Sequence, residues 1–232
     1  MIKRLTTIVS TVALVAGAAG VATAQTSAEI HGDPGCAPSP FDGDTVTLTG
    51  VVYVEAGTYN SGSVYFQDNT DGGMTFFDSA FQGVLAEGDE IEVTGTVGAF
   101  NEEIQLNGVT VNVLSSGNAI TPVTLTSGDL ADGTDQLGNF VEVEGLLSIV
   151  SSGFNSVYEV DDGSGPVIVF VDGTTGIDTA ALDALAGDIV RVRGSSKCFQ
   201  GIGEVLPRRD ADIELLTVDS DETSFGEVKA RF

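Results

Sequence analysis

The sequence has few of the side chains on which most catalytic and metal sites depend. It contains no tryptophan, one histidine and two cysteines among 232 residues, and only 9 Lys and Arg stand against 34 Asp and Glu. Most zinc sites are therefore excluded, and the only Ser-His-Asp triad left is one through His31. The net charge of −25 excludes general adhesion to nucleic-acid backbones, since few cations are present to replace phosphate counterions.

The residues that are present indicate a packed and exported protein. A hydrophobic content of 42% is too high for a disordered acidic tail. Lys3 and Arg4 precede a small apolar run over 5–22, and the run ends in Ala-Thr-Ala before Gln25, which is typical of a cleaved signal peptide over 1–24. An uncleaved anchor is the alternative, although the run is poor in Leu. We expect a secreted or periplasmic chain with no membrane span, whose acidity keeps it soluble in a saline habitat.

Export decides how the two cysteines are interpreted. In an oxidising compartment Cys36 and Cys198 most simply form one disulfide, which would connect the mature N-terminus to the last third of the chain. Two unpaired thiols are the alternative. No C-x-x-C motif is present, so redox catalysis is not expected. His31 is expected to be structural, because no nucleophile can be assigned to it.

An internal repeat divides the mature chain into two units. The pattern G-D-x-[IV]-x-V-x-G occurs at 88–95 and 187–194, and V-Y-x-x-D occurs at 64–68 and 157–161. The offset is 99 for the first pattern and 93 for the second, so six extra residues precede the fourth strand of the second unit. They lie in 177–186, where apolar spacing predicts a short helix with Thr179 as a candidate cap.

Each unit shows the order strand, strand, strand, short helix, strand, strand, which is the order of an OB-fold. We therefore predict an all-β protein of two tandem OB-fold-like five-stranded barrels, each with a short helix between strands 3 and 4. The barrels are expected over 25–114 and 136–216, with a polar linker over 115–135 and a flexible acidic tail over 217–232. A single long sandwich is the alternative.

Several short motifs carry a family resemblance. They are Ala28-Glu29-Ile30-His31, Ser39-Pro40, Phe66-Gln67-Asp68, Gly88-Asp89 and Pro207-Arg208-Arg209-Asp210-Ala211-Asp212-Ile213. Together they resemble the OB-fold accessory domains of secreted bacterial nucleases of the endonuclease/exonuclease/phosphatase class. Those nucleases carry a separate catalytic domain, which this sequence does not contain. The resemblance thus implies an accessory or ligand-binding role, with nucleic acid as the ligand class and a nuclease as a possible partner.

A basic cluster in the second unit is the clearest candidate binding site. It comprises Arg191, Arg193, Lys197, Arg208 and Arg209. Strand alternation directs Arg191 and Arg193 outward, and Lys197 falls in the loop that lines OB-fold grooves. We predict a groove for single-stranded nucleic acid, another anion or an oligosaccharide, with Phe66 as a stacking residue. The alternatives are Arg–carboxylate ion pairs and a Phe66 that lies in the core.

Acidic turns raise the question of a bound Ca²⁺ or Mg²⁺. The weak candidate ligands are Asp68, Asp71, Asp161 and Asp162. Neither turn has EF-hand spacing, and Asp and Gly are also what tight turns require, so no metal or other cofactor is expected. The favoured function is an exported, non-catalytic binding module. A metal-dependent extracellular nuclease or phosphodiesterase and a structural acidic surface protein are the alternatives.

Overall fold

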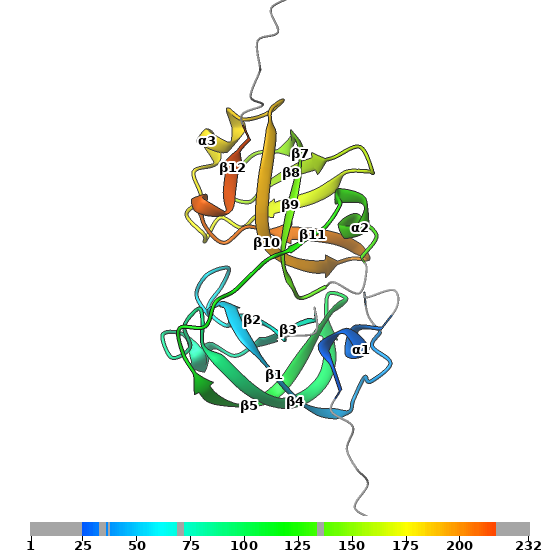
Figure 1. Ribbon diagram of the computed structural model, residues 1–232, viewed down its shortest axis with the longest axis vertical. Helices are drawn as coiled ribbons and strands as arrows, with labels where there is room; N and C mark the ends of the chain where they lie inside the picture. The colour runs from blue at the N-terminus through cyan, green and yellow to red at the C-terminus, as the bar shows by residue number, and fades with distance from the viewer. Residues whose placement is uncertain (1–24, 33–35, 37, 69–71, 134–136, 217–232) are drawn as a thin grey trace, which may run out of the picture.

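The computed structural model describes residues 25–32, 36, 38–68, 72–133 and 137–216. The expected signal peptide over 1–24, the expected tail over 217–232 and Asp71 lie outside these residues. Two barrels follow one another along the long axis of the molecule (Figure 1). In the part of the chain that is described, no helix combines the length and the apolar character needed to cross a membrane.

The first barrel is a closed sheet with strand order β1-β2-β3-β5-β4. Its strands are β1 (Thr45–Val54), β2 (Ser63–Gln67), β3 (Gly73–Phe77), β4 (Glu90–Phe100) and β5 (Glu103–Ser115). The parallel pairing of β3 with β5 closes it, and the short 3₁₀ helix η1 (Ser79–Phe81) lies between β3 and β4. Alternate residues of β1 fill the interior, where Val46, Leu48 and Val52 are buried.

The second barrel repeats this order. Its strands are β7 (Phe140–Ser151), β8 (Ser156–Asp161), β9 (Val167–Val171), β10 (Ile189–Phe199) and β11 (Ile202–Leu206). The pairing of β10 with β7 and the parallel pairing of β11 with β9 close the ring. Two short strands extend it, β12 (Ile213–Leu215) beside β10 and β6 (Val123–Thr124) beside β7, and the 3₁₀ helix η2 (Asp210–Asp212) precedes β12. The predicted pair of OB-fold-like barrels is confirmed.

The predicted helix of the second unit is α3 (Thr179–Asp183). Its N-cap is Asp178 rather than Thr179, because the Asp178 carboxylate accepts hydrogen bonds from the N–H groups of Ala180 and Ala181, each at 3.1 Å. An aspartate in this position satisfies two backbone donors that the first helical turn leaves without partners.

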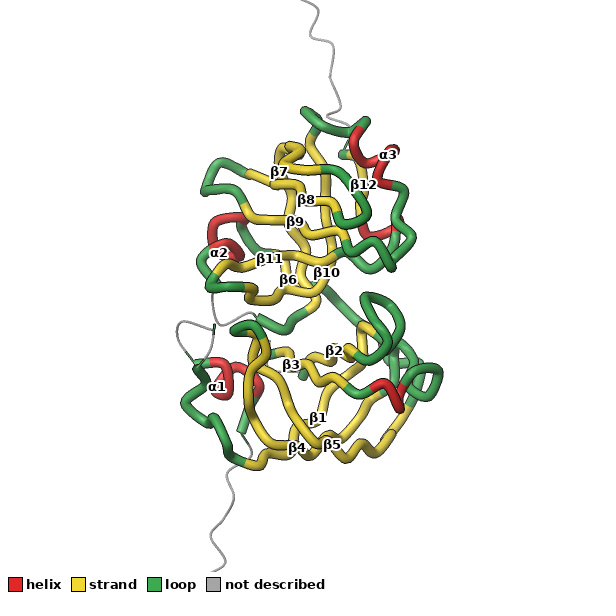
Figure 2. The backbone as a smooth tube through the Cα atoms, turned by 180° about the vertical axis from the view of Figure 1, so that it is seen from behind, coloured by secondary structure: helices red, strands yellow, loops and turns green. Residues whose placement is uncertain are grey.

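A short helix also precedes each barrel, and sequence reasoning missed both. These helices are α1 (Ser27–His31) and α2 (Ser127–Ala131), which lie on the same side of the molecule in Figure 2. Each begins after a capping threonine, and Ile30 and Leu130 enter the two cores. The shared pattern T-S-x-[DE]-[IL] begins at Thr26 and at Thr126. The segment predicted as a linker, 115–135, thus contains a helix that packs into the second barrel.

Strand register corrects the alignment of the V-Y-x-x-D pattern by one residue. Gly50 and Gly145 pair with matching residues of β4 and β10, and two residues after each glycine Val52 pairs with Phe66 while Leu147 pairs with Val160. Phe66 therefore corresponds to Val160, an interior residue, and not to Glu159. A slip of one residue reverses the face of every side chain. Phe66 is fully buried, so its predicted role as a stacking residue is wrong.

Candidate ligand-binding cleft between the barrels

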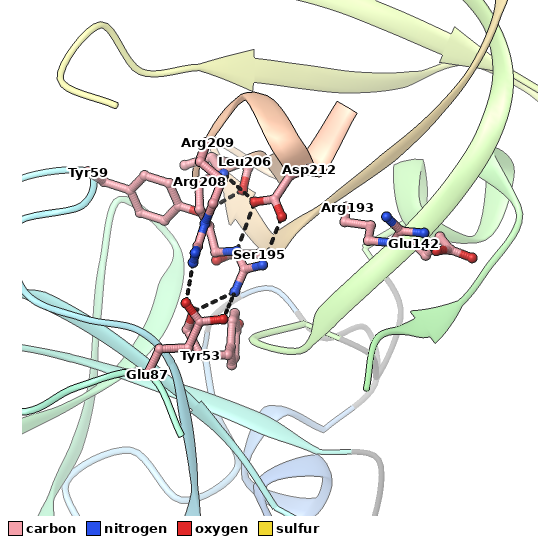
Figure 3. Close-up of polar contacts among 10 residues, drawn as sticks. All are labelled: Tyr53, Tyr59, Glu87, Glu142, Arg193, Ser195, Leu206, Arg208, Arg209 and Asp212. Atoms are coloured by element: carbon pink, nitrogen blue, oxygen red, sulfur yellow. Dashed lines mark hydrogen bonds and ion pairs between the residues drawn. The ribbon is translucent and has the colours of Figure 1, made fainter. Parts of the chain in front are cut away.

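The barrels meet through a cluster of buried, mostly aromatic side chains. Its buried members are Tyr53, Val54, Tyr59, Tyr65, Phe140 and Leu206. The Tyr59 hydroxyl donates to the Leu206 carbonyl at 2.5 Å and lies 3.0 Å from Ser195 Oγ (Figure 3). The Tyr53 hydroxyl donates to the Gly138 carbonyl. Burial raises the pKa of Tyr53, Tyr59 and Tyr65 above the ordinary value, so all three stay neutral and help to fix the two barrels against each other.

Arg208 belongs to this joint rather than to an open groove. Its guanidinium is buried and contacts both oxygens of Asp212 at 2.8 Å. It also donates to the Tyr53 carbonyl at 2.8 Å and to Glu87 at 3.0 Å, both in the first barrel (Figure 3). The guanidinium carbon lies 4.0 Å from the centre of the Phe140 ring, while the more exposed Arg209 pairs with Glu87. The predicted ligand role of Arg208 is corrected: this side chain stabilises the contact between the barrels.

Arg191 and Arg193 are bound in ion pairs across strands. Arg191 lies opposite Glu144 in the β10–β7 register, and its Nε is 2.8 Å from that carboxylate. Arg191 also contacts Glu214 at 2.9 Å, and Arg193 contacts Glu142 at 2.6 Å. Both point outward as strand alternation predicts, but the carboxylates opposite them supply the charge that a bound anion would bring. Ion pairing, the alternative in the sequence analysis, is what the structure shows.

Lys197 lines a cleft between the barrels with a volume of about 410 Å³. One wall comes from β2, β3, the end of β4 and β5 of the first barrel, and the other comes from β9, β10 and Leu206 of the second. In OB-folds the face of strands 2 and 3 and the adjoining loops bind ligands. The cleft therefore lies on the face of the first barrel that OB-folds use for binding, and residues of the second barrel form its opposite side.

Four phenylalanines line this cleft, two from each barrel. Phe77 is 56% exposed and Phe100 is 65% exposed, while Phe170 and Phe199 are partly exposed. They form two pairs of equivalent residues. Phe100 and Phe199 each end the strand that begins with the G-D motif, at the same offset of 99. Phe77 and Phe170 occupy matching places opposite β2 and β8. Sequence reasoning missed all four, although the shared offset was a visible signal.

The hairpins that carry Phe100 and Phe199 meet at their tips. Asn101 and Glu102 have φ values of +50° and +70°, and Gln200 and Gly201 have +52° and +78°. Positive φ at both central residues is the mark of a type I′ turn, which joins two strands tightly. The Gln200 N–H donates to the Asn101 carbonyl at 3.5 Å. Equivalent hairpins of the two barrels thus form one rim of the cleft.

Beside the phenylalanines, the cleft is lined by polar groups and by charges of both signs. The Tyr65 hydroxyl donates to Glu103 at 2.7 Å. Burial raises the pKa of Glu103, whereas Lys197 and the Tyr65 hydrogen bond act in the opposite direction. On the same strand Gln105 donates to Asn107 at 2.8 Å. Lys197 is the one cation of the described residues with no carboxylate within ion-pair distance.

The predicted disulfide lies beside the cleft. Cys36 and Cys198 are bonded, with their Cα atoms 5.6 Å apart, and Cys198 is one of the residues that line the cleft. The disulfide prediction is confirmed. His31 is buried nearby, and its Nε2 donates to the Gly73 carbonyl at 3.0 Å, which is a structural role.

The acidic turns use their carboxylates to hold local structure. Asp68 accepts the N–H of Ser27 at 3.1 Å, and Asp162 accepts the hydroxyl of Ser127 at 2.8 Å. Asp161 accepts the N–H of Gly163 at 2.8 Å. Hydrogen bonds from Ser164 and Ser127 hold the pKa of Asp162 far below its usual range. Among the described residues, no group of three or more His, Cys, Asp and Glu is placed to hold a metal ion.

Comparison with known proteins gives no relative by sequence: no family model matches, and neither does any curated protein. Three solved structures are similar in part. The S. pombe Stn1–Ten1 complex has 22% identity over 33% of this chain and a TM-score of 0.29, and this chain spans 57% of that one. OBody AM1L10 bound to hen egg-white lysozyme has 18% identity and a TM-score of 0.34, and the match covers 44% of this chain and 98% of that one. A murine DNA binding protein bound with double-stranded DNA has 14% identity and a TM-score of 0.40, and the match covers 70% of this chain and 95% of that one. Likenesses this distant carry no argument about what this chain binds.

Proposed function

We propose that the protein is an exported, non-catalytic binding module that holds its ligand in the cleft between the barrels. The observation that carries the proposal is the convergence of two pairs of equivalent phenylalanines on one pocket. Exposed aromatic rings in a concave site are typical of surfaces that a ligand covers. The signal-peptide pattern supports export, and the family resemblance supports an auxiliary role beside a partner nuclease.

The chemistry of the cleft favours binding over catalysis. The Tyr65 hydroxyl donates to Glu103, and burial raises the pKa of Tyr65, so this hydroxyl stays protonated and is not an activated nucleophile. The alternative of a metal-dependent nuclease relied on the acidic turns. The carboxylates of Asp68, Asp161 and Asp162 accept hydrogen bonds from their own turns and neighbouring helices, and this structural role supports binding over metal-dependent catalysis.

The test is to map binding by amide chemical shifts in the mature chain. The probes are oligothymidylate at low salt and a panel of neutral soluble hexasaccharides. We expect shifts to cluster in 100–107 and 197–201 and to disappear in Phe100→Ala. Phe154→Ala is the matched control, because Phe154 is 75% exposed and lies outside the cleft. Shifts centred on Arg191 and Arg193, or none with any probe, would contradict the proposal.

A further inference from the structure

We infer that the ligand of this cleft is an uncharged saccharide, an inference that rests on the proposed function and names its ligand class. The first support is charge. Lys197 faces a lining that includes two carboxylates, Glu103 and Asp172. A polyphosphate chain would meet more negative than positive charge and would be repelled on balance. A neutral ligand does not meet this penalty.

The second support is the pattern of hydrogen-bonding groups. A sugar hydroxyl both donates and accepts, so its site needs both kinds of partner. The Gln105–Asn107 hydrogen bond joins Gln105 Nε2 to Asn107 Oδ1. This hydrogen bond orients both side chains and leaves Gln105 Oε1 and Asn107 Nδ2 outside it, with Asn107 Nδ2 lying over Gly98 of β4. Carboxamides provide both functions without charge, whereas phosphate sites are built from donors and cations.

The third support is the exposed faces of Phe77 and Phe100. A sugar ring has an apolar C–H face and a rim of hydroxyls, so it packs on an aromatic ring while its edge reaches nearby amides. A nucleobase also stacks on phenylalanine. However, OB-fold grooves for single strands combine stacking with a positively charged track for the backbone, and this cleft has one lysine. Because four of the five described cations are in ion pairs, the saccharide is favoured.

The experiment is calorimetric titration of the mature chain at low and high salt, with neutral hexasaccharides of glucose, xylose and N-acetylglucosamine and with oligothymidylate. We expect at least one saccharide to bind with an affinity that salt leaves unchanged. The double substitution Gln105→Ala with Asn107→Ala should weaken binding about tenfold or more, since two hydrogen bonds of about 1 kcal/mol each are lost. Asn112→Ala is the control, because Asn112 is an exposed asparagine of the same strand outside the cleft.

Salt dependence separates the two ligand classes. Saccharide affinity should change less than threefold between low and high salt, whereas binding to a phosphate backbone would fall steeply as salt rises. If oligothymidylate binds the cleft with strong salt dependence and no saccharide binds, the saccharide inference fails while the proposed function stands. If no probe binds the cleft, both fail.

Discussion

Replacing Arg208 with methionine tests whether the joint between the barrels depends on one buried cation. The side chains of Arg208 and Asp212 are 6% and 5% exposed. In the variant, the Asp212 carboxylate stays buried without its partner, and the Tyr53 carbonyl loses a donor at 2.8 Å. Removal of one member of a buried ion pair costs about 3–5 kcal/mol. We therefore expect the free energy of unfolding in urea to fall by about that amount.

Two comparisons make this prediction refutable. Arg209→Met removes a guanidinium that is 51% exposed and also pairs with Glu87, so its cost should be about 0–1 kcal/mol. A double variant, Arg208→Met with Asp212→Leu, removes both charges and should recover part of the loss, because no buried carboxylate is left without a partner. If Arg208→Met costs no more than Arg209→Met, or if the double variant is no more stable than the single one, the reasoning is refuted.

Three further predictions concern the core, the disulfide and the tyrosines. Phe66→Ala should cost about 3–5 kcal/mol in urea unfolding, whereas Phe154→Ala should cost well under 1; similar values would contradict the assignment of Phe66 to the core. Loss of the Cys36–Cys198 bond should cost roughly 2–5 kcal/mol, seen as a lower unfolding midpoint in reductant, and a Cys36→Ser variant that is insensitive to reductant is its control. All four tyrosines have a pKa raised above the ordinary 10.0, mainly by burial. Above pH 10 the unfolded chain therefore releases protons that the folded chain keeps, and stability falls by about 1.4 kcal/mol per pH unit for each tyrosine. Absorbance at 295 nm should stay flat past pH 10 and rise only with unfolding, and a gradual rise from pH 10 in the folded protein would contradict this.

The fold could be predicted from the sequence because its signals are local. Strand alternation places Val190 and Val192 inward and Arg191 and Arg193 outward, and each of these placements follows from neighbouring residues. Both G-D motifs mark a glycine with positive φ, Gly88 at +91° and Gly187 at +94°, so the motif encodes a turn and identifies the same strand in both barrels.

The site was harder to predict because it depends on pairings between distant segments. The partners of Arg191 are set by the register of β10 with β7, which brings Glu144 opposite it across 47 positions of the chain. Likewise, Arg208 reaches Glu87 only because the barrels stack. The V-Y-x-x-D pattern misled for a different reason. Two similar pentapeptides matched one residue out of register, and in a strand a shift of one residue exchanges core and surface.

The stacking of the barrels has a consequence for the length of ligand that the cleft holds. The binding face of a single OB barrel is open at both ends and lets a polymer pass across it. Here the second barrel lies over that face, the hairpins at Asn101 and Gln200 meet along one rim, and the cleft has a volume of about 410 Å³. A site of this size holds a small ligand or a short segment of a chain. We therefore expect affinity to rise from mono- to trisaccharide and then to level off, with less than a threefold gain from trisaccharide to hexasaccharide in calorimetric titration. An affinity that kept increasing with each added sugar would show that the ligand extends outside the cleft, and that the second barrel does not close it.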